Sequence, residues 1–152
     1  MSTADLRPTR ATDADLPALI ELLGETEGCA PLTVWSVPWQ LYDYWLIRDE
    51  GHQGNVIAAG SLQPIEGSRR AEIRGLVVAE SHRGQGLASR IVEHLCRIAA
   101  DRQLDVVCIT TSPGFFERHG FEGVAPDWLP AHRRDVECGD APRVALRRGG
   151  DA

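Results

Sequence analysis

The sequence predicts an α+β (mixed α/β) fold, and three observations on its 152 residues support this prediction. Residues 44–79 contain three β-type segments separated by turns. The pattern then changes to a long amphipathic helix over residues 86–101. A further strand, a short helix and two closing strands follow. Such an order is typical of a sheet with helices packed on it, and the length suits a single domain over residues 1–152.

The first half of the chain begins with a short strand over residues 5–10 and a helix. Thr12 is the expected cap residue of this helix, and Gly24 is its expected end. Residues 31–42, which contain two tryptophans and Pro38, suggest short helical pieces. Strands are expected at 44–48, 55–62 and 71–79, with turns at 51–54 and 66–68.

The second half begins with the long helix. Its apolar residues Leu87, Ile91, Leu95 and Ile98 recur every three or four positions. Residues 105–110 form a β-branched strand, and residues 113–119 form a short helix that ends at Gly120. The closing strands are expected at 121–125 and 143–146.

Composition excludes several classes of function. The net charge of -6 argues against a nucleic-acid partner, and no apolar run is long enough to span a membrane. None of the 16 basic residues is a lysine, so a Walker-type phosphate loop and a Schiff-base mechanism are both disfavoured. His82, His94 and His119 lack metal-ligand spacing, so we expect no metal and interpret these histidines as surface or packing residues. The four cysteines lie far apart and are expected to be reduced thiols of a cytoplasmic protein.

The most informative segment, residues 76–89, runs from an apolar strand through a glycine-rich turn into the long helix. Backbone N–H groups at a helix start, together with the helix dipole, favour an anion. Gly84 and Gly86 let the backbone approach a phosphate, and Arg83 adds positive charge. An ordinary strand-to-helix turn is the alternative. A dinucleotide-binding turn is disfavoured because Ser89 stands where G-x-G-x-x-G requires glycine or alanine.

Two motifs in this order resemble the GCN5-related N-acetyltransferase (GNAT) superfamily. Arg83-x-x-Gly86-x-Ala88 matches its acetyl-CoA signature Q/R-x-x-G-x-G/A, and residues 115–121 resemble its closing helix and Gly-Phe pair. The resemblance implies a mostly antiparallel sheet, splayed open between the strands at 71–79 and 105–110, with acetyl-CoA in the split. It implies cofactor binding by Leu76, Val77, Val78, Arg83, Gly84, Gln85, Gly86, Leu87, Ala88, Ser89 and Phe115.

A narrower resemblance concerns the acceptor. Residues 72–78, 115–121 and 129–135 are similar to the acetyltransferase domain of N-acetylglutamate synthases and small stand-alone relatives. In these enzymes an arginine after a Leu-Pro pair holds the acceptor's carboxylate, and Arg133 takes that position, with Arg74 as a second candidate. The chain has Asp140 and Pro142 where the synthases have further arginine and serine ligands, so an acid-bearing amine other than glutamate fits as well. The alternative for Arg133 is a solvated helix face.

Glu72 is the candidate general base, and it aligns with the glutamate base of histone-type relatives. Side-chain alternation places it on the same face as Val78 if no bulge intervenes, and the Val78 N–H is the expected oxyanion donor. The alternative is a surface glutamate paired with arginine. The tyrosine that reprotonates CoA in many relatives is replaced by Phe116. That acid is therefore unnecessary, missing, or replaced by Ser112, His119 or water.

The resemblance therefore implies direct acetyl transfer from acetyl-CoA to a small amine, and homodimers are common among such relatives. Charge and hydropathy argue against a nucleic-acid or membrane partner. Two alternatives stay open: acetylation of protein N-termini or lysines, and a non-catalytic acyl-CoA sensor. An aromatic group before the first hairpin either covers the acceptor pocket or packs in the core; its members are Trp35, Trp39, Tyr42 and Trp45.

Overall fold

The computed structural model describes residues 6–24, 41–49, 54–110, 112–125 and 143–147. In this part of the chain seven strands form one sheet in the order β1-β2-β3-β4-β5-β7-β6. The strands are β1 (Thr9–Arg10), β2 (Tyr44–Asp49), β3 (Asn55–Ile65), β4 (Arg70–Val78), β5 (Asp105–Thr110), β6 (Glu122–Val124) and β7 (Arg143–Arg147). The helices are α1 (Leu16–Gly24), α3 (Leu87–Asp101) and α4 (Pro113–Glu117), with 3-10 turns η2 (Asp13–Asp15), η3 (Leu41–Asp43) and η5 (Glu80–His82).

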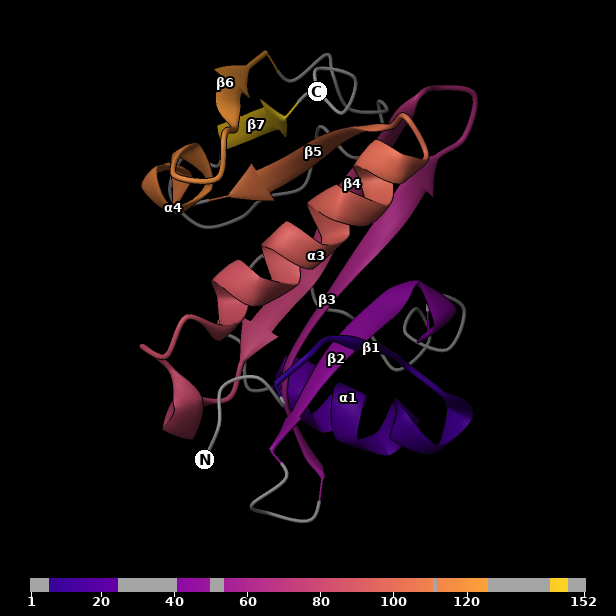
Figure 1. The fold of residues 1–152 in the computed structure, drawn as a ribbon, viewed down its shortest axis with the longest axis vertical. Helices are drawn as coiled ribbons and strands as arrows, with labels where there is room; N and C mark the ends of the chain where they lie inside the picture. Colours follow the sequence, from indigo (N-terminus) through magenta and orange to yellow (C-terminus); the bar gives the residue numbers. More distant parts are fainter. Residues whose placement is uncertain (1–5, 25–40, 50–53, 111, 126–142, 148–152) are drawn as a thin grey trace.

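This architecture confirms the predicted α+β fold. The element order agrees with the sequence, although β3 extends to Ile65 rather than ending at residue 62. Figure 1 shows β1, β2 and α1 at one end of the molecule, β5, β6, β7 and α4 at the other, and α3 crossing the middle of the sheet. Of the helical pieces predicted for residues 31–42, residues 31–40 lie outside the described residues, and residues 41–42 begin the 3-10 turn η3. No helix in the described ranges is long and apolar enough to cross a membrane.

The start of α1 is fixed to β2 through Asp15. Its carboxylate accepts hydrogen bonds from the Thr12 amide at 2.8 Å and hydroxyl at 3.1 Å, and it pairs with Arg48. Burial would raise the pKa of Asp15, but the hydrogen bonds from Arg48 and Thr12 outweigh it and hold the pKa below its usual value of 3.8. Thr12 is the N-cap of η2, the 3-10 turn that leads directly into α1, so the predicted cap lies where the sequence placed it.

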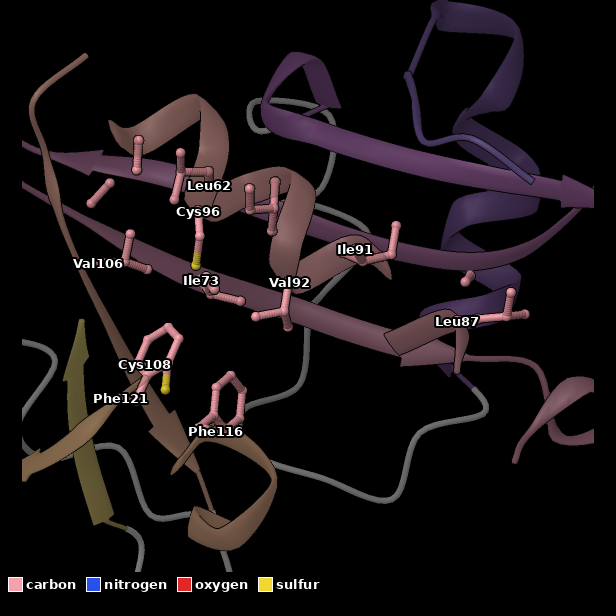
Figure 2. Close-up of a cluster of buried hydrophobic side chains, with 14 of the residues drawn as sticks. Leu62, Ile73, Leu87, Ile91, Val92, Cys96, Val106, Cys108, Phe116 and Phe121 are labelled. Carbon is pink, nitrogen blue, oxygen red and sulfur yellow. The ribbon is translucent and has the colours of Figure 1, made fainter. Parts of the chain in front are cut away.

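The two faces of the sheet carry separate cores. On one face α3 packs against the sheet, and Figure 2 shows Val92 and Cys96 of this helix near Ile73, with Phe116 and Phe121 beside Cys108. On the other face α1 packs with Leu19, Leu22 and Leu23 around Tyr44, Leu46, Ala59 and Val77. Cys96 and Cys108 are buried free thiols, in agreement with the prediction; Cys29 and Cys138 lie outside the described residues.

Pairing along β4 changes in the middle of the strand. Its first residues pair in parallel with β5, from Arg70 opposite Asp105 to Ile73 opposite Cys108. Beyond Ile73 the described residues of β4 pair with β3 but not with β5. The sheet is otherwise antiparallel, so this point is where it splays, as the family resemblance implied.

A β-bulge lies at the same point. Ala59 pairs with Val77 but Ser61 pairs with Arg74, so Gly60 opposes two residues, Gly75 and Leu76. Gly75 has φ +64°, a left-handed conformation that suits glycine. The extra residue shifts side-chain alternation by one position.

The bulge corrects one sequence prediction. Before it, Ala71 and Ile73 belong to the α3 core; after it, Leu76 and Val78 pack against that core. Glu72, between Ala71 and Ile73, therefore points to the face opposite Val78. Glu72 and Val78 were expected to share a face if no bulge intervened; the bulge is present, so they lie on opposite faces.

Candidate active site

The glycine-rich loop has the geometry of an anion site. Gly84 and Gly86 have φ +79° and +77°, and among the described residues nothing lies within 4 Å of the position a Cβ would take at either glycine. The Arg90 amide donates the first helical bond, to the Gly86 carbonyl at 3.1 Å. The amides of Leu87, Ala88 and Ser89 precede it, so the helix itself offers them no acceptor.

Charge at the loop comes from Arg83, whose Nε donates to the Val78 carbonyl at 3.3 Å. This bond draws the arginine side chain back toward the end of β4, and Gln85 between the glycines is exposed. Left-handed glycines, amides at a helix start and an arginine together fit a diphosphate.

The strand end before the loop presents a backbone edge. The side chains of Leu76 and Val78 pack on the α3 core and that of Val77 on the α1 core. One edge of these residues pairs with β3, whereas β5 has already separated from β4. An extended ligand can pair with such an edge as an added strand would.

Phe115 approaches the same loop from the other side of the splay. Its ring lies 5.1 Å from the His119 ring, and His119 Nε2 lies 3.1 Å from the Ser89 hydroxyl. The structure thus brings together two predicted cofactor residues, Phe115 and Ser89, that are 26 positions apart in the chain. Phe116 is buried against Phe121 and offers no proton to a leaving group.

A buried polar patch lies on the sheet face opposite α3, across β2, β3 and β4. Ser61 is opposite both Tyr44 and Arg74 in register, and Gln63 is opposite Glu72. Gln63 accepts from the Arg74 guanidinium at 3.0 Å and donates to the Ser61 hydroxyl at 3.0 Å, and Ser61 donates to the Arg74 carbonyl at 2.9 Å. This chain of bonds fixes the Arg74 side chain beside the bulge.

Glu72 belongs to this polar patch and is 4% exposed. It stands two register positions from the Ser61–Arg74 pair and on the same face of the sheet, in the last stretch of β4 that pairs on both sides. Glu72 therefore lies near Arg74, as predicted. It is buried, so the alternative interpretation of Glu72 as a surface residue was wrong.

Tyr44 is a member of the patch that the sequence analysis did not single out. Its side chain is fully buried, and its hydroxyl occupies the space where a Cβ on Gly75 would lie. Burial raises the pKa of Tyr44 to about 12; Ser61 lies near enough to lower it, yet no described residue meets the geometry of a hydrogen bond to the hydroxyl. Strand register is the signal that could have revealed Tyr44. This residue begins β2, and only β3 lies between β2 and β4 in the sheet.

The other acceptor-side expectations have mixed outcomes. Arg133 lies outside the described residues, as do Asp140, Pro142, Trp35 and Trp39. Tyr42 is 57% exposed and donates to Asp13 at 2.5 Å, whereas Trp45 packs against His94 with ring centroids 4.3 Å apart. These two aromatic residues therefore do not share one pocket. Within the described ranges no group of three or more His, Cys, Asp or Glu side chains is placed to hold a metal ion.

Comparison with known proteins identifies the class. The family model "Acetyltransferase (GNAT) family" matches residues 16–121, more than half of the chain. An amino-acid acetyltransferase of Mycobacterium tuberculosis is 30% identical over 139 residues, which cover 88% of this chain and 79% of that protein. The chain therefore belongs to the acetyltransferase (GNAT) family and is an N-acetyltransferase.

Solved structures agree with the fold. N-acetylglutamate synthase from Neisseria gonorrhoeae, complexed with coenzyme A and N-acetyl-glutamate, matches with a TM-score of 0.83 at 19% identity. The match covers 99% of this chain but only 36% of the synthase. A Mycobacterium tuberculosis protein solved in complex with CoA matches with a TM-score of 0.79 at 22% identity, covering 93% of this chain and 98% of that one.

Proposed function

We propose that this protein uses acetyl-CoA to acetylate the amino group of a small amino-acid-like acceptor that carries an acid group. The single observation that carries the proposal is the position of the buried polar patch. Gln63 fixes the Arg74 guanidinium beside the bulge, at the point where β4 separates from β5. The diphosphate loop, residues 83–89, follows further along the chain. Relatives named for amino-acid and glutamate acetylation support the same acceptor class.

The cosubstrate lies along the unpaired edge of β4 in this proposal. The backbone of Leu76, Val77 and Val78 pairs with the pantetheine arm, and residues 83–89 hold the diphosphate. Phe115 closes the site from α4. The thioester then lies near the bulge, within reach of groups on the opposite face of the sheet.

Transfer is direct, without an acyl-enzyme. The acceptor amine loses a proton to Glu72, directly or through one water, and its nitrogen attacks the thioester carbon. A C–N bond forms, the C–S bond breaks, and CoA leaves as the thiolate, which takes a proton from water. A backbone N–H after the bulge, at Val78, stabilises the developing oxyanion.

The acceptor's acid group is held by arginine. A guanidinium matches a planar carboxylate in two parallel hydrogen bonds, and Gln63 keeps that of Arg74 in one orientation. Arg133, which follows a Leu-Pro pair, is the second arginine that we assign to this group. Two arginines favour an acceptor with a free carboxylate over a peptide N-terminus.

The test is a thiol-release assay with acetyl-CoA and a panel of amino acids, their phosphinic analogues, simple amines and short peptides. Arg74→Ala should raise the acceptor KM by about tenfold or more, because a charged hydrogen bond is worth roughly 1.5–3 kcal/mol, and leave the KM for acetyl-CoA unchanged. Arg69→Ala, in the exposed turn before β4, is the matched control and should change neither constant.

Two outcomes would overturn the proposal. Turnover confined to peptides would assign the protein to peptide acetylation. CoA binding without thiol release for any amine would assign it to acyl-CoA sensing.

A further inference from the structure

Two histidines hold the diphosphate loop, one at each end. His82 immediately precedes the loop, in η5. Its Nε2 lies 3.0 Å from Oδ2 of Asp49, and its Nδ1 lies 2.8 Å from the Ser81 hydroxyl. Asp49 is 2% exposed and ends β2, so this contact joins the start of the loop to a strand on the far side of β3.

His119 holds the other end. It follows α4, and its Nε2 lies 3.1 Å from the hydroxyl of Ser89, the last residue of the loop. Its Nδ1 lies 2.6 Å from Oε1 of Glu93, one turn further along α3. Glu93 also lies 3.6 Å from the Arg147 guanidinium of β7. This cluster crosses the splay and joins the β4–α3 side of the site to the α4–β7 side.

The chemistry of imidazole fixes the direction of these bonds. A carboxylate only accepts, so in each ring the nitrogen that faces Asp49 or Glu93 carries the proton and donates it. In the neutral ring the second nitrogen accepts from a hydroxyl, Ser81 for His82 and Ser89 for His119. Each carboxylate thereby fixes the tautomer and the orientation of its ring. The His119 ring contacts Ser89 at the end of the loop, and the His82 ring contacts Ser81 in η5, just before the loop.

We propose that His82 and His119 are positioning residues that hold the backbone amides of residues 83–89 in the arrangement that binds a diphosphate. The inference rests on the proposed binding of CoA by this loop. A glycine-rich loop has many alternative conformations, and ordering it on binding costs free energy. Contacts that order it beforehand therefore lower the dissociation constant of the diphosphate ligand.

The experiment compares two acetyl donors. Acetyl-CoA carries the diphosphate, whereas S-acetyl-pantetheine lacks it and does not use the loop. His82→Ala and His119→Ala should each raise the KM for acetyl-CoA about tenfold, the effect of losing roughly 1.4 kcal/mol. The KM and kcat with S-acetyl-pantetheine should stay unchanged. The double variant should show about the product of the two effects, because the two contacts are separate.

Conservative and control variants sharpen the test. His82→Gln and His119→Gln keep an amide near the position of Nε2 and should recover part of the loss. His94→Ala removes a histidine of α3 that stacks on Trp45, and it should leave the donor preference unchanged. If His82→Ala does not fold because it leaves Asp49 without this donor, Asp49→Asn combined with His82→Ala removes the buried charge as well.

The outcomes separate the two proposals. If the wild-type protein does not prefer acetyl-CoA over S-acetyl-pantetheine, the assignment of the loop, and with it the proposed function, is wrong. If the wild type has that preference and both alanine variants keep it in full, the loop binds the diphosphate without help from the histidines and this inference is wrong. An equal loss with both donors would indicate general destabilisation and would also contradict it.

Discussion

The two halves of strand β4 share β3 as a neighbour but differ in their other edge. Residues 70–73 pair with β3 on one side and with β5 on the other, and Ala71 and Ile73 insert into the α3 core. Residues 74–78 pair with β3 alone, contain the bulge and lead toward the glycine-rich loop. The first half is a scaffold strand, and the second half is an open edge that a ligand can use.

Packing shows how the second half is kept distinct. A Cβ on Gly60 would lie 2.6 Å from the Ile91 methyl of α3, and a Cβ on Gly75 would overlap the Tyr44 hydroxyl. The bulge is therefore held between α3 on one face and Tyr44 on the other, and a glycine faces each contact. A fixed bulge sends the Glu72 side chain, assigned to proton removal, to the face opposite the Val78 side chain. Oxyanion binding is assigned to the Val78 backbone N–H, which lies in the plane of the sheet.

Gly75→Ala is expected to have the largest effect on stability and activity, because it disrupts the bulge that separates the two halves of β4. Alanine must adopt φ +64°, at a cost of roughly 1–2 kcal/mol, and its methyl group displaces the Tyr44 ring, which adds about 1–3 kcal/mol. We expect a clear loss of unfolding free energy in urea and no measurable thiol release. The matched control is Gly67→Ala in the β3–β4 turn, where φ is +76° but nothing described lies within 4 Å. A Gly75→Ala enzyme with normal turnover would show that the bulge is not needed.

A smaller effect is expected from Glu72→Gln, in the scaffold half. Removal of a general base lowers kcat by roughly 10²–10⁴-fold, and the remaining rate should lose its rise with pH. Binding of CoA should not change, because the loop lies beyond the bulge. The measurement is kcat against pH, with Glu66→Gln, exposed in the β3–β4 turn, as control. An unchanged pH profile would show that Glu72 is not the general base. The reaction would then depend on residues 74–78 and the loop alone.

Local signals account for the parts of the fold and site that the sequence predicted. Thr12 at the start of α1, the apolar spacing of α3 and the glycines at 84 and 86 each act within a few residues. These features reveal a helix or a phosphate loop without knowledge of the tertiary structure. The local geometry of the proposed cofactor side was therefore predictable.

The acceptor side depends on register, which the sequence does not display. The bulge follows from contacts of Gly60 with Ile91 and of Gly75 with Tyr44, and these residues are 31 positions apart in both pairs. Gly75 inside a strand pattern was the available signal of a bulge. Interpretation of His82 and His119 as packing residues missed their bonds to Asp49 and Ser89, because each partner is brought close only by the folded sheet.

The smallest expected effect is that of Tyr44→Phe, which tests how the bulge is held. No described residue bonds the Tyr44 hydroxyl, so its removal at neutral pH should leave the unfolding free energy equal or raise it by about 1–3 kcal/mol. The pKa of Tyr44 is raised from 10 to about 12, so the folded state disfavours the phenolate relative to the protonated hydroxyl, and the unfolding free energy falls as the pH rises from 10 toward 12. Urea unfolding at pH 8, 10 and 11 should therefore show a steeper alkaline loss for the wild type than for Tyr44→Phe. Cys96, whose pKa burial raises to about 11, titrates in both proteins and cancels in the difference.

The same substitution also tests the contact with Gly75. Without the hydroxyl, the nearest ring atoms lie 3.0 Å from the position of the new Cβ, so Tyr44→Phe should recover part of the stability that Gly75→Ala loses. Tyr42→Phe, whose exposed hydroxyl bonds Asp13, should recover none. Additive losses in the Gly75→Ala, Tyr44→Phe double variant would mean that backbone conformation alone, and not the tyrosine, fixes the open half of β4.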